Sequence, residues 1–105
     1  MPAVVKLSWP TASGTYDLPP ITQGAAETYT SFQSRAAKLA RAGMQQHPPT
    51  GCVRMRWCAS GVPKDEQVCP NPGESSADFI NRAAAWIAAM LTDFPATNDC
   101  VPPYP

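Results

Sequence analysis

The chain has 105 residues, with eight basic and eight acidic side chains and therefore no formal net charge. This balance, without a basic tail, argues against a nucleic-acid-binding protein. Val, Leu, Ile and Phe together supply only 16 residues, so residues 1–105 are expected to form one small domain with a thin core. Chains of this kind usually need a covalent staple.

Residues 3–9 alternate between apolar and polar positions, with Val5, Leu7 and Trp9 on one face. A period of two predicts a strand, and the flanking Pro2 and Pro10 favour an edge position. Residues 10–24 are rich in Thr, Ser, Gly and Pro and are expected to form a long loop.

A first helix is predicted over residues 30–44. Thr30 and Gln33 have the spacing of a capping box, although the start could lie nearer Ala25. An apolar stripe runs from Phe32 to Gly43, and Pro48 follows as a stop signal.

Residues 52–58 are the second predicted strand, with Val53, Met55 and Trp57 on one face and Cys52 and Cys58 on the other. The two cysteines would lie about 20 Å apart, too far for a bond between them. The predicted disulfides are Cys58–Cys69, across a turn at residues 60–63, and Cys52–Cys100.

Residues 61–74 contain three prolines and are expected to be irregular. A second helix is predicted over 76–94, beginning at a Ser75–Asp78 capping box and stopped by Pro95. Its apolar residues cover more than half of its circumference, which indicates burial on several sides. Residues 95–105 are expected to form an extended, Pro-rich tail, and no internal repeat is detected.

The expected fold is therefore α+β, with two helices, two or three short strands, proline-rich loops and disulfides. Zinc is the competing use of the four cysteines, but structural zinc sites usually contain close C-x-x-C pairs. The gaps here are wider, and His47 is the only histidine. No metal and no cofactor are expected.

No set of residues forms a nucleophile, a base and an orienting group, so the chain is not expected to be an enzyme. His47 is interpreted as an exposed loop residue, and Asp65 and Glu66 as a solvated pair. Arg54 and Arg56 lie beside Cys52 and Cys58 and could activate a thiolate, which leaves a metal or redox module as a third hypothesis.

Every charged residue between Glu27 and Asp65 is basic. This pattern fits either a solvated basic face or docking on an acidic protein surface, including another copy of the chain, whereas nucleic acid is an unlikely partner. Large apolar and Arg side chains are favoured at interfaces. The expected partner-binding residues are Arg35, Lys38, Arg41, Arg54, Arg56, Trp86 and Met90.

The leading functional hypothesis is a structural or interaction protein, a small accessory subunit that bridges or cements larger proteins. Residues 1–30 show no conventional signal, whereas disulfides are typical of oxidising compartments. A protein made in the cytosol and oxidised later, for example in a particle released from the cell, would reconcile these two facts. The small, Pro-rich and Ala-rich chain without a signal is similar to accessory proteins of tailed-phage particles. The alternative is an exported disulfide-rich binding module, either an inhibitor or an effector, whose signal has been removed.

Overall fold

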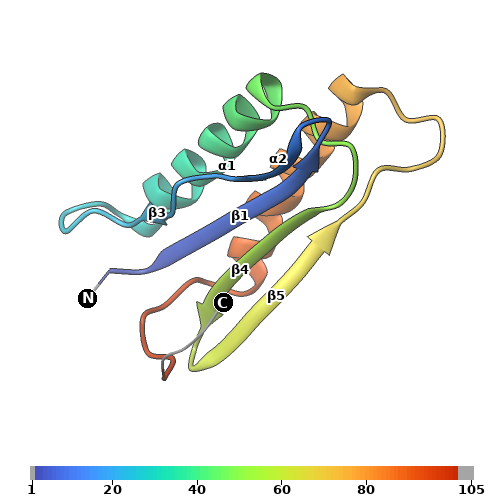
Figure 1. The fold of residues 1–105 in the computed structure, drawn as a ribbon. Coiled ribbons are helices and arrows are strands. Elements are labelled where there is room, and N and C mark those ends of the chain that lie inside the picture. Colours follow the sequence, from blue (N-terminus) through green and yellow to red (C-terminus); the bar gives the residue numbers. More distant parts are fainter. Residues whose placement is uncertain (1, 102–105) are drawn as a thin grey trace.

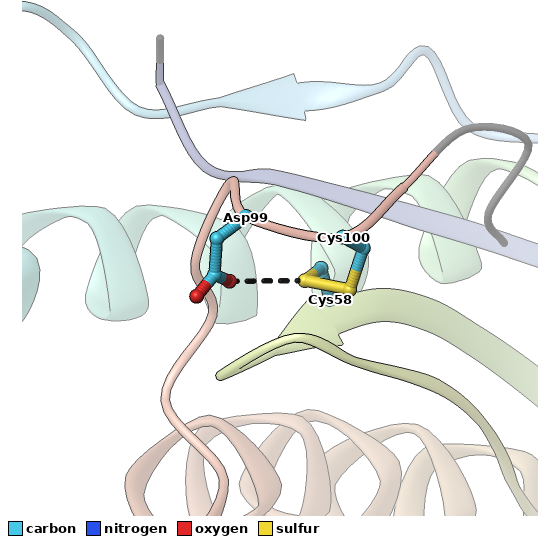
Figure 2. Close-up of side chains that lie close together, drawn as sticks. All are labelled: Cys58, Asp99 and Cys100. Atoms are coloured by element: carbon cyan, nitrogen blue, oxygen red, sulfur yellow. Dashed lines mark hydrogen bonds between the residues drawn. A yellow bond between two sulfur atoms is a disulfide. The ribbon is translucent and has the colours of Figure 1, made fainter.

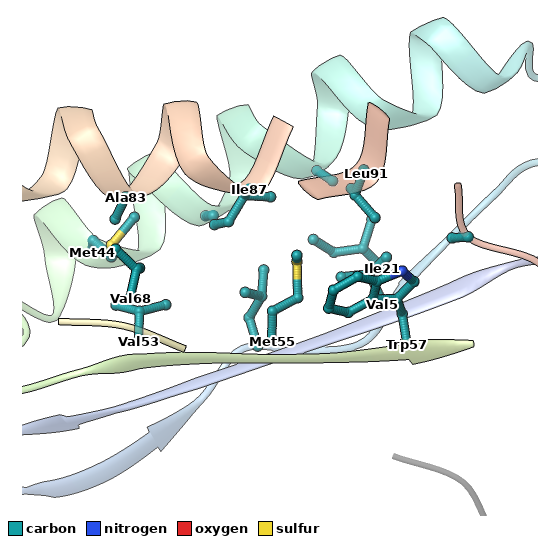
Figure 3. Close-up of a cluster of buried hydrophobic side chains, with 14 of the residues drawn as sticks. Val5, Ile21, Met44, Val53, Met55, Trp57, Val68, Ala83, Ile87 and Leu91 are labelled. Atoms are coloured by element: carbon teal, nitrogen blue, oxygen red, sulfur yellow. The ribbon is translucent and has the colours of Figure 1, made fainter. Parts of the chain in front are cut away.

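The computed structural model describes residues 2–101 and consists of two layers, an antiparallel sheet and a pair of helices (Figure 1). Both helices cover the same face of the sheet, so its other face carries no helix (Figure 3). The elements in chain order are β1 (Val4–Thr11), β2 (Gly14–Asp17), β3 (Ile21–Thr22), α1 (Tyr29–Gln46), β4 (Val53–Ala59), β5 (Val62–Val68) and α2 (Ser76–Asp93).

The sheet has the strand order β2-β1-β4-β5, and the short β3 pairs with β1 next to β2. β1 and β4 are therefore the two central strands. They pair with each other, and Leu7 lies directly opposite Met55. The helices run antiparallel to each other, since the Tyr29 hydroxyl at the start of α1 donates to the Leu91 carbonyl near the end of α2.

The α+β class, both predicted helices and the strands at 3–9 and 52–58 are confirmed. Ser75 caps α2 as expected, because its hydroxyl accepts the Asp78 N–H. In α1 the cap is Thr28 rather than Thr30, and its hydroxyl accepts the Ser31 N–H. The helix α1 also extends beyond its predicted end at residue 44 and continues to Gln46.

Four expectations about strands are wrong. The sheet has five strands rather than the expected two or three. Residues 10–24 contain β2 and β3, and residues 61–74 begin with β5, which includes Pro63. An edge strand tolerates proline because one side of it has no partner in the chain. The strand predicted at the edge is instead central, since β1 pairs with β2 and β3 on one side and with β4 on the other.

The structure also contains an internal repeat that the sequence analysis missed. Residues 3–50 and 51–97 each form an antiparallel strand pair followed by a helix. In the first half β1 pairs with β2 and β3, which together occupy the place that β5 has in the second half. Identical residues occupy equivalent places in the two halves, shifted by 48 positions in the first strands and by 47 in the helices. These pairs include Trp9/Trp57, Glu27/Glu74, Phe32/Phe79, Arg35/Arg82 and Pro48/Pro95.

Equivalent hydrogen bonds show that the repeat extends to side chains. The Trp9 indole N–H donates to the His47 carbonyl at 2.7 Å, and the Trp57 indole N–H donates to the Phe94 carbonyl at 2.9 Å. Both carbonyls belong to the residue that caps the C-terminus of a helix. Each tryptophan therefore ties the end of a helix to a central strand.

The shift changes from 48 to 47 because the first half has one extra residue between β2 and β3. The pairing of β1 moves by one position between Ser8↔Asp17 and Val5↔Ile21, which is a bulge. Leu18 lies in this bulge and packs over Gly43, where an added Cβ would lie 2.9 Å from the Leu18 Cδ1 atom. The equivalent of Gly43 in the second half is Met90, so the leucine fills the space that a methionine fills there.

One apolar core lies between the sheet and the helices (Figure 3). Its largest fully buried side chains include Trp9, Trp57 and Phe32, which supply much of the volume that a chain poor in aliphatic residues lacks. The buried face of α2 contacts this core, and Trp86 and Met90 pack against it half-buried. The apolar surface of α2 is thus largely covered within the chain.

Each helix has an equivalent ion pair between a glutamate that precedes it and an arginine within it. Arg35 donates to both carboxylate oxygens of Glu27 and to the Thr22 carbonyl. Arg82 donates to both oxygens of Glu74 and to the Cys69 carbonyl. These bonds hold the pKa of Glu27 and of Glu74 at about 2, and backbone N–H groups of Gly24 and Asn71 assist.

Acid should therefore destabilise the protein through these two glutamates. Their pKa is about 2 when folded and near the ordinary 4.5 when unfolded, so their contribution is complete above about pH 5 and is lost as the pH falls toward about 2. We expect the E27Q/E74Q variant to melt below the wild type at neutral pH and to approach it at about pH 2. Thermal unfolding followed by circular dichroism measures this, and a gap of constant size across that range would contradict it.

Candidate functional site: the open face of the sheet

The face of the sheet without helices is the candidate site, and it is called the open face below. Side chains alternate along a strand, so the residues between the core positions of β1 and β4 lie on this face. They include Lys6, Ser8, Arg54 and Arg56. The register places Lys6 directly opposite Arg56 and Ser8 directly opposite Arg54.

Lys6 and Arg56 form a like-charge pair in the middle of the open face. Directly opposed residues on neighbouring strands have Cβ atoms about 5 Å apart, and like charges at such positions are destabilising. The Arg56 Nε atom is buried and has no hydrogen-bond partner among the described residues. A buried donor without an acceptor also carries a desolvation cost. Asp65 lies directly opposite Arg56 on β5, but its carboxylate is hydrogen-bonded to Arg54. An anionic group placed on this face would reduce the repulsion between Lys6 and Arg56.

Arg54, unlike Arg56, has a carboxylate partner. It binds the Asp65 carboxylate of β5 with two hydrogen bonds, one of them 2.8 Å from Nε to Oδ1. These bonds lower the pKa of Asp65, and the charge of Arg56 contributes in the same direction. Both partners remain substantially exposed to solvent, so the pair organises the surface more than it stabilises the fold.

Two disulfides fasten the strand that carries these arginines. The bonds are Cys52–Cys69 and Cys58–Cys100, so the predicted pairing of Cys58 with Cys69 and of Cys52 with Cys100 is wrong. The prediction that Cys52 and Cys58 are not bonded to each other is confirmed. The bonds lie at the two ends of β4, on either side of Arg54 and Arg56.

The β4–β5 hairpin explains the actual pairing. Ser60 and Gly61 both have positive φ, which is the geometry of a two-residue type I′ turn. Such a turn pairs Ala59 with Val62 and continues the register to Val53 opposite Val68. One further step places Cys52 opposite Cys69, whereas Cys58 lies opposite Pro63.

The second disulfide has a carboxylate beside it, and Figure 2 shows the arrangement. Cys58, Cys100 and Asp99 form the one cluster of potential metal ligands found in residues 2–101. Disulfide sulfur is not the thiolate that binds metals, so this oxidised form offers a single ligand, the Asp99 carboxylate. That carboxylate accepts hydrogen bonds from Thr97 and from the Gly61 N–H, which lower its pKa and fix the 97–100 segment to the hairpin turn.

The structure does not bring the predicted basic residues together. Arg35, Lys38 and Arg41 lie on α1, and Arg35 is already paired with Glu27. Arg54 and Arg56 lie on the opposite side of the sheet. Lys6 was not among the predicted site residues, because its place beside Arg56 depends on the pairing of β1 with β4. Its alternation with Val5 and Leu7 was the available signal.

His47 is not an exposed loop residue. It is half-buried at the C-terminus of α1, where its ring stacks on Tyr16 with centroids 3.9 Å apart. Phe94 occupies the equivalent place in the second half, and the Lys64 ammonium lies over its ring at 4.0 Å. The position of His47 is therefore explained by the packing of the repeat.

No family model, no curated protein and no solved structure matches this chain. Within the described residues, neither helix is long and apolar enough to cross a bilayer. The part of the predicted tail from residue 102 onward lies outside the described residues.

The disulfide assignment has a direct chemical test, because trypsin sites separate all four cysteines. A non-reducing digest should yield fragment 42–54 linked to 65–82, and fragment 57–64 linked to 83–105. Mass spectrometry before and after reduction identifies each pair. A link between 57–64 and 65–82 would contradict the structure and restore the pairing expected from the sequence.

Proposed function

We propose that the protein is a small structural and interaction subunit that binds an acidic surface of a larger protein through its open face. The observation that carries this proposal is the Lys6–Arg56 like-charge pair with its unpartnered Arg56 Nε atom. Such an arrangement costs stability in the isolated chain. A bound carboxylate would offset the repulsion between these two cations.

The form of the open face supports a protein partner over nucleic acid. The cations Lys6, Arg54 and Arg56 are few, and Asp65 already binds one of them. Nucleic-acid-binding surfaces gain affinity by neutralising many phosphates with a larger basic patch. A patch of this size, flanked by acids and rigid strands, suits a few carboxylates at defined positions.

The disulfides support a function in binding or cementing. Because they fasten both ends of β4, Arg54 and Arg56 are held in a rigid frame, and little conformational entropy is lost when a partner binds. An assembly exposed to oxidising conditions, such as a released phage particle, is the setting we propose. We propose no catalytic activity and no cofactor.

An exported disulfide-rich binding module is the second candidate. The observation in its favour is that all four cysteines are paired, as is usual for small secreted domains. The metal or redox hypothesis has less support, since it requires thiolates that this oxidised form lacks. The structural subunit and the exported module would both bind through the open face, so one binding experiment tests both.

Charge reversal on the open face should abolish binding to carboxylates. We expect a synthetic Glu- and Asp-rich peptide to bind the wild type and to bind K6E/R56E about tenfold more weakly or worse. Arg54 is left unchanged because its reversal would break the pair with Asp65. Fluorescence anisotropy at low salt measures the affinity, and circular dichroism verifies folding.

The matched control is K38E/R41E, which makes the same change in charge on exposed positions of α1. This variant should bind the peptide like the wild type. Equal losses in both variants would mean that only net charge matters and would overturn the proposal. A DNA oligonucleotide of equal charge that binds the open face more tightly than the peptide would favour nucleic acid instead.

A further inference from the structure

The two outer edges of the sheet differ although the two halves of the chain are equivalent. One edge is formed by β2 and β3, which are short and are separated by the bulge at Leu18 and by Pro19 and Pro20. The other edge is β5, which continues without interruption over Val62–Val68. Short and bulged edges resist pairing with other chains, whereas a long continuous edge permits it.

The order of charges along β5 is self-complementary. Lys64, Asp65 and Glu66 follow one another, and neither Lys64 nor Glu66 has an ion-pair partner among the described residues. Charge on an edge strand normally prevents pairing because like charges meet. When two copies of β5 run antiparallel about Asp65, however, Lys64 of each copy lies opposite Glu66 of the other.

The same register suits the remaining positions of β5. Val62, which is 54% exposed, lies opposite Val68 of the second copy, so two apolar pairs form at the ends. Pro63 of each copy lies opposite Gln67 of the other. Because proline has no N–H, one inter-strand hydrogen bond is missing at each of these two positions. The two copies of Asp65 meet at the centre, where each carboxylate is already neutralised by its own Arg54.

Neighbouring registers of the same orientation are worse. Moving the centre of symmetry by one residue places Lys64 opposite Lys64, or Glu66 opposite Glu66, without a neutralising partner. Like charges directly opposite each other destabilise a sheet, and opposite charges stabilise it. The charge order of β5 thus selects the register centred on Asp65.

We propose that two copies of this chain associate through β5 in the antiparallel register centred on Asp65. The association joins two five-stranded sheets into one, and a twofold axis at Asp65 places both open faces on the same side. The dimer is inferred independently of the proposed function. If the open face does bind acidic proteins, the dimer carries two such faces, which allows one assembly to be bridged to another.

Charge-swap variants of the full, oxidised chain test this inference. Sedimentation equilibrium should give twice the mass of one chain for the wild type at high micromolar concentration. K64E and E66K should each raise the dimer dissociation constant about tenfold or more, since each change brings like charges together twice. The double variant K64E/E66K should dimerise again, and an equimolar mixture of K64E with E66K should form a heterodimer.

K38E is the matched control, because it reverses one exposed lysine on α1 and should leave the dimer intact. A wild-type chain that remains monomeric up to millimolar concentration would overturn the inference. A dimer that persists unchanged in K64E and E66K would overturn the β5 interface. Peptide binding by the open face is measured separately, so failure of the dimer and failure of the proposed function are distinguishable.

Discussion

The antiparallel pairing of β1 with β4 is the constraint on which the rest of this structure depends. Each half of the chain supplies only a hairpin and one helix, and an isolated two-stranded hairpin is marginal in water. Pairing β1 with β4 produces one wide sheet, and the two helices then share one core above it (Figure 3). Leu7 opposite Met55 marks the centre of this arrangement, since these two positions are equivalent in the repeat.

The features on which the proposed function rests lie where the two halves differ. Ser8 of the first half corresponds to Arg56 of the second, so the basic character of the open face is concentrated on β4. Val4 and Pro10 correspond to Cys52 and Cys58, so only the second half is fastened by disulfides. The bulge that blunts one edge of the sheet has no counterpart in β5. The packing that the two halves share supports the fold, and the positions where they differ make the open face basic and leave β5 as a continuous edge.

Interactions that act over a few residues could be predicted from the sequence. The Ser75–Asp78 cap and the stop at Pro95 defined α2, and alternating side chains defined β1 and β4. The hairpin and its disulfide were also within reach, because Ser60-Gly61 is a two-residue turn that places Cys52 opposite Cys69. The three prolines of residues 61–74 predict an irregular segment and so conceal this hairpin, but Pro63 lies on an edge strand that tolerates it.

The sequence alone determined the α+β class, the two helices, the two central strands and the need for staples, since each depends on local periodicity, capping or composition. The tertiary structure decided which strands pair, which cysteines bond and which cations share a surface. Those outcomes depend on register between segments almost 50 residues apart, and a shift of one residue moves every side chain to the other face. Lys6 meets Arg56, and Arg35 is separated from both, only because β1 pairs with β4 in this register.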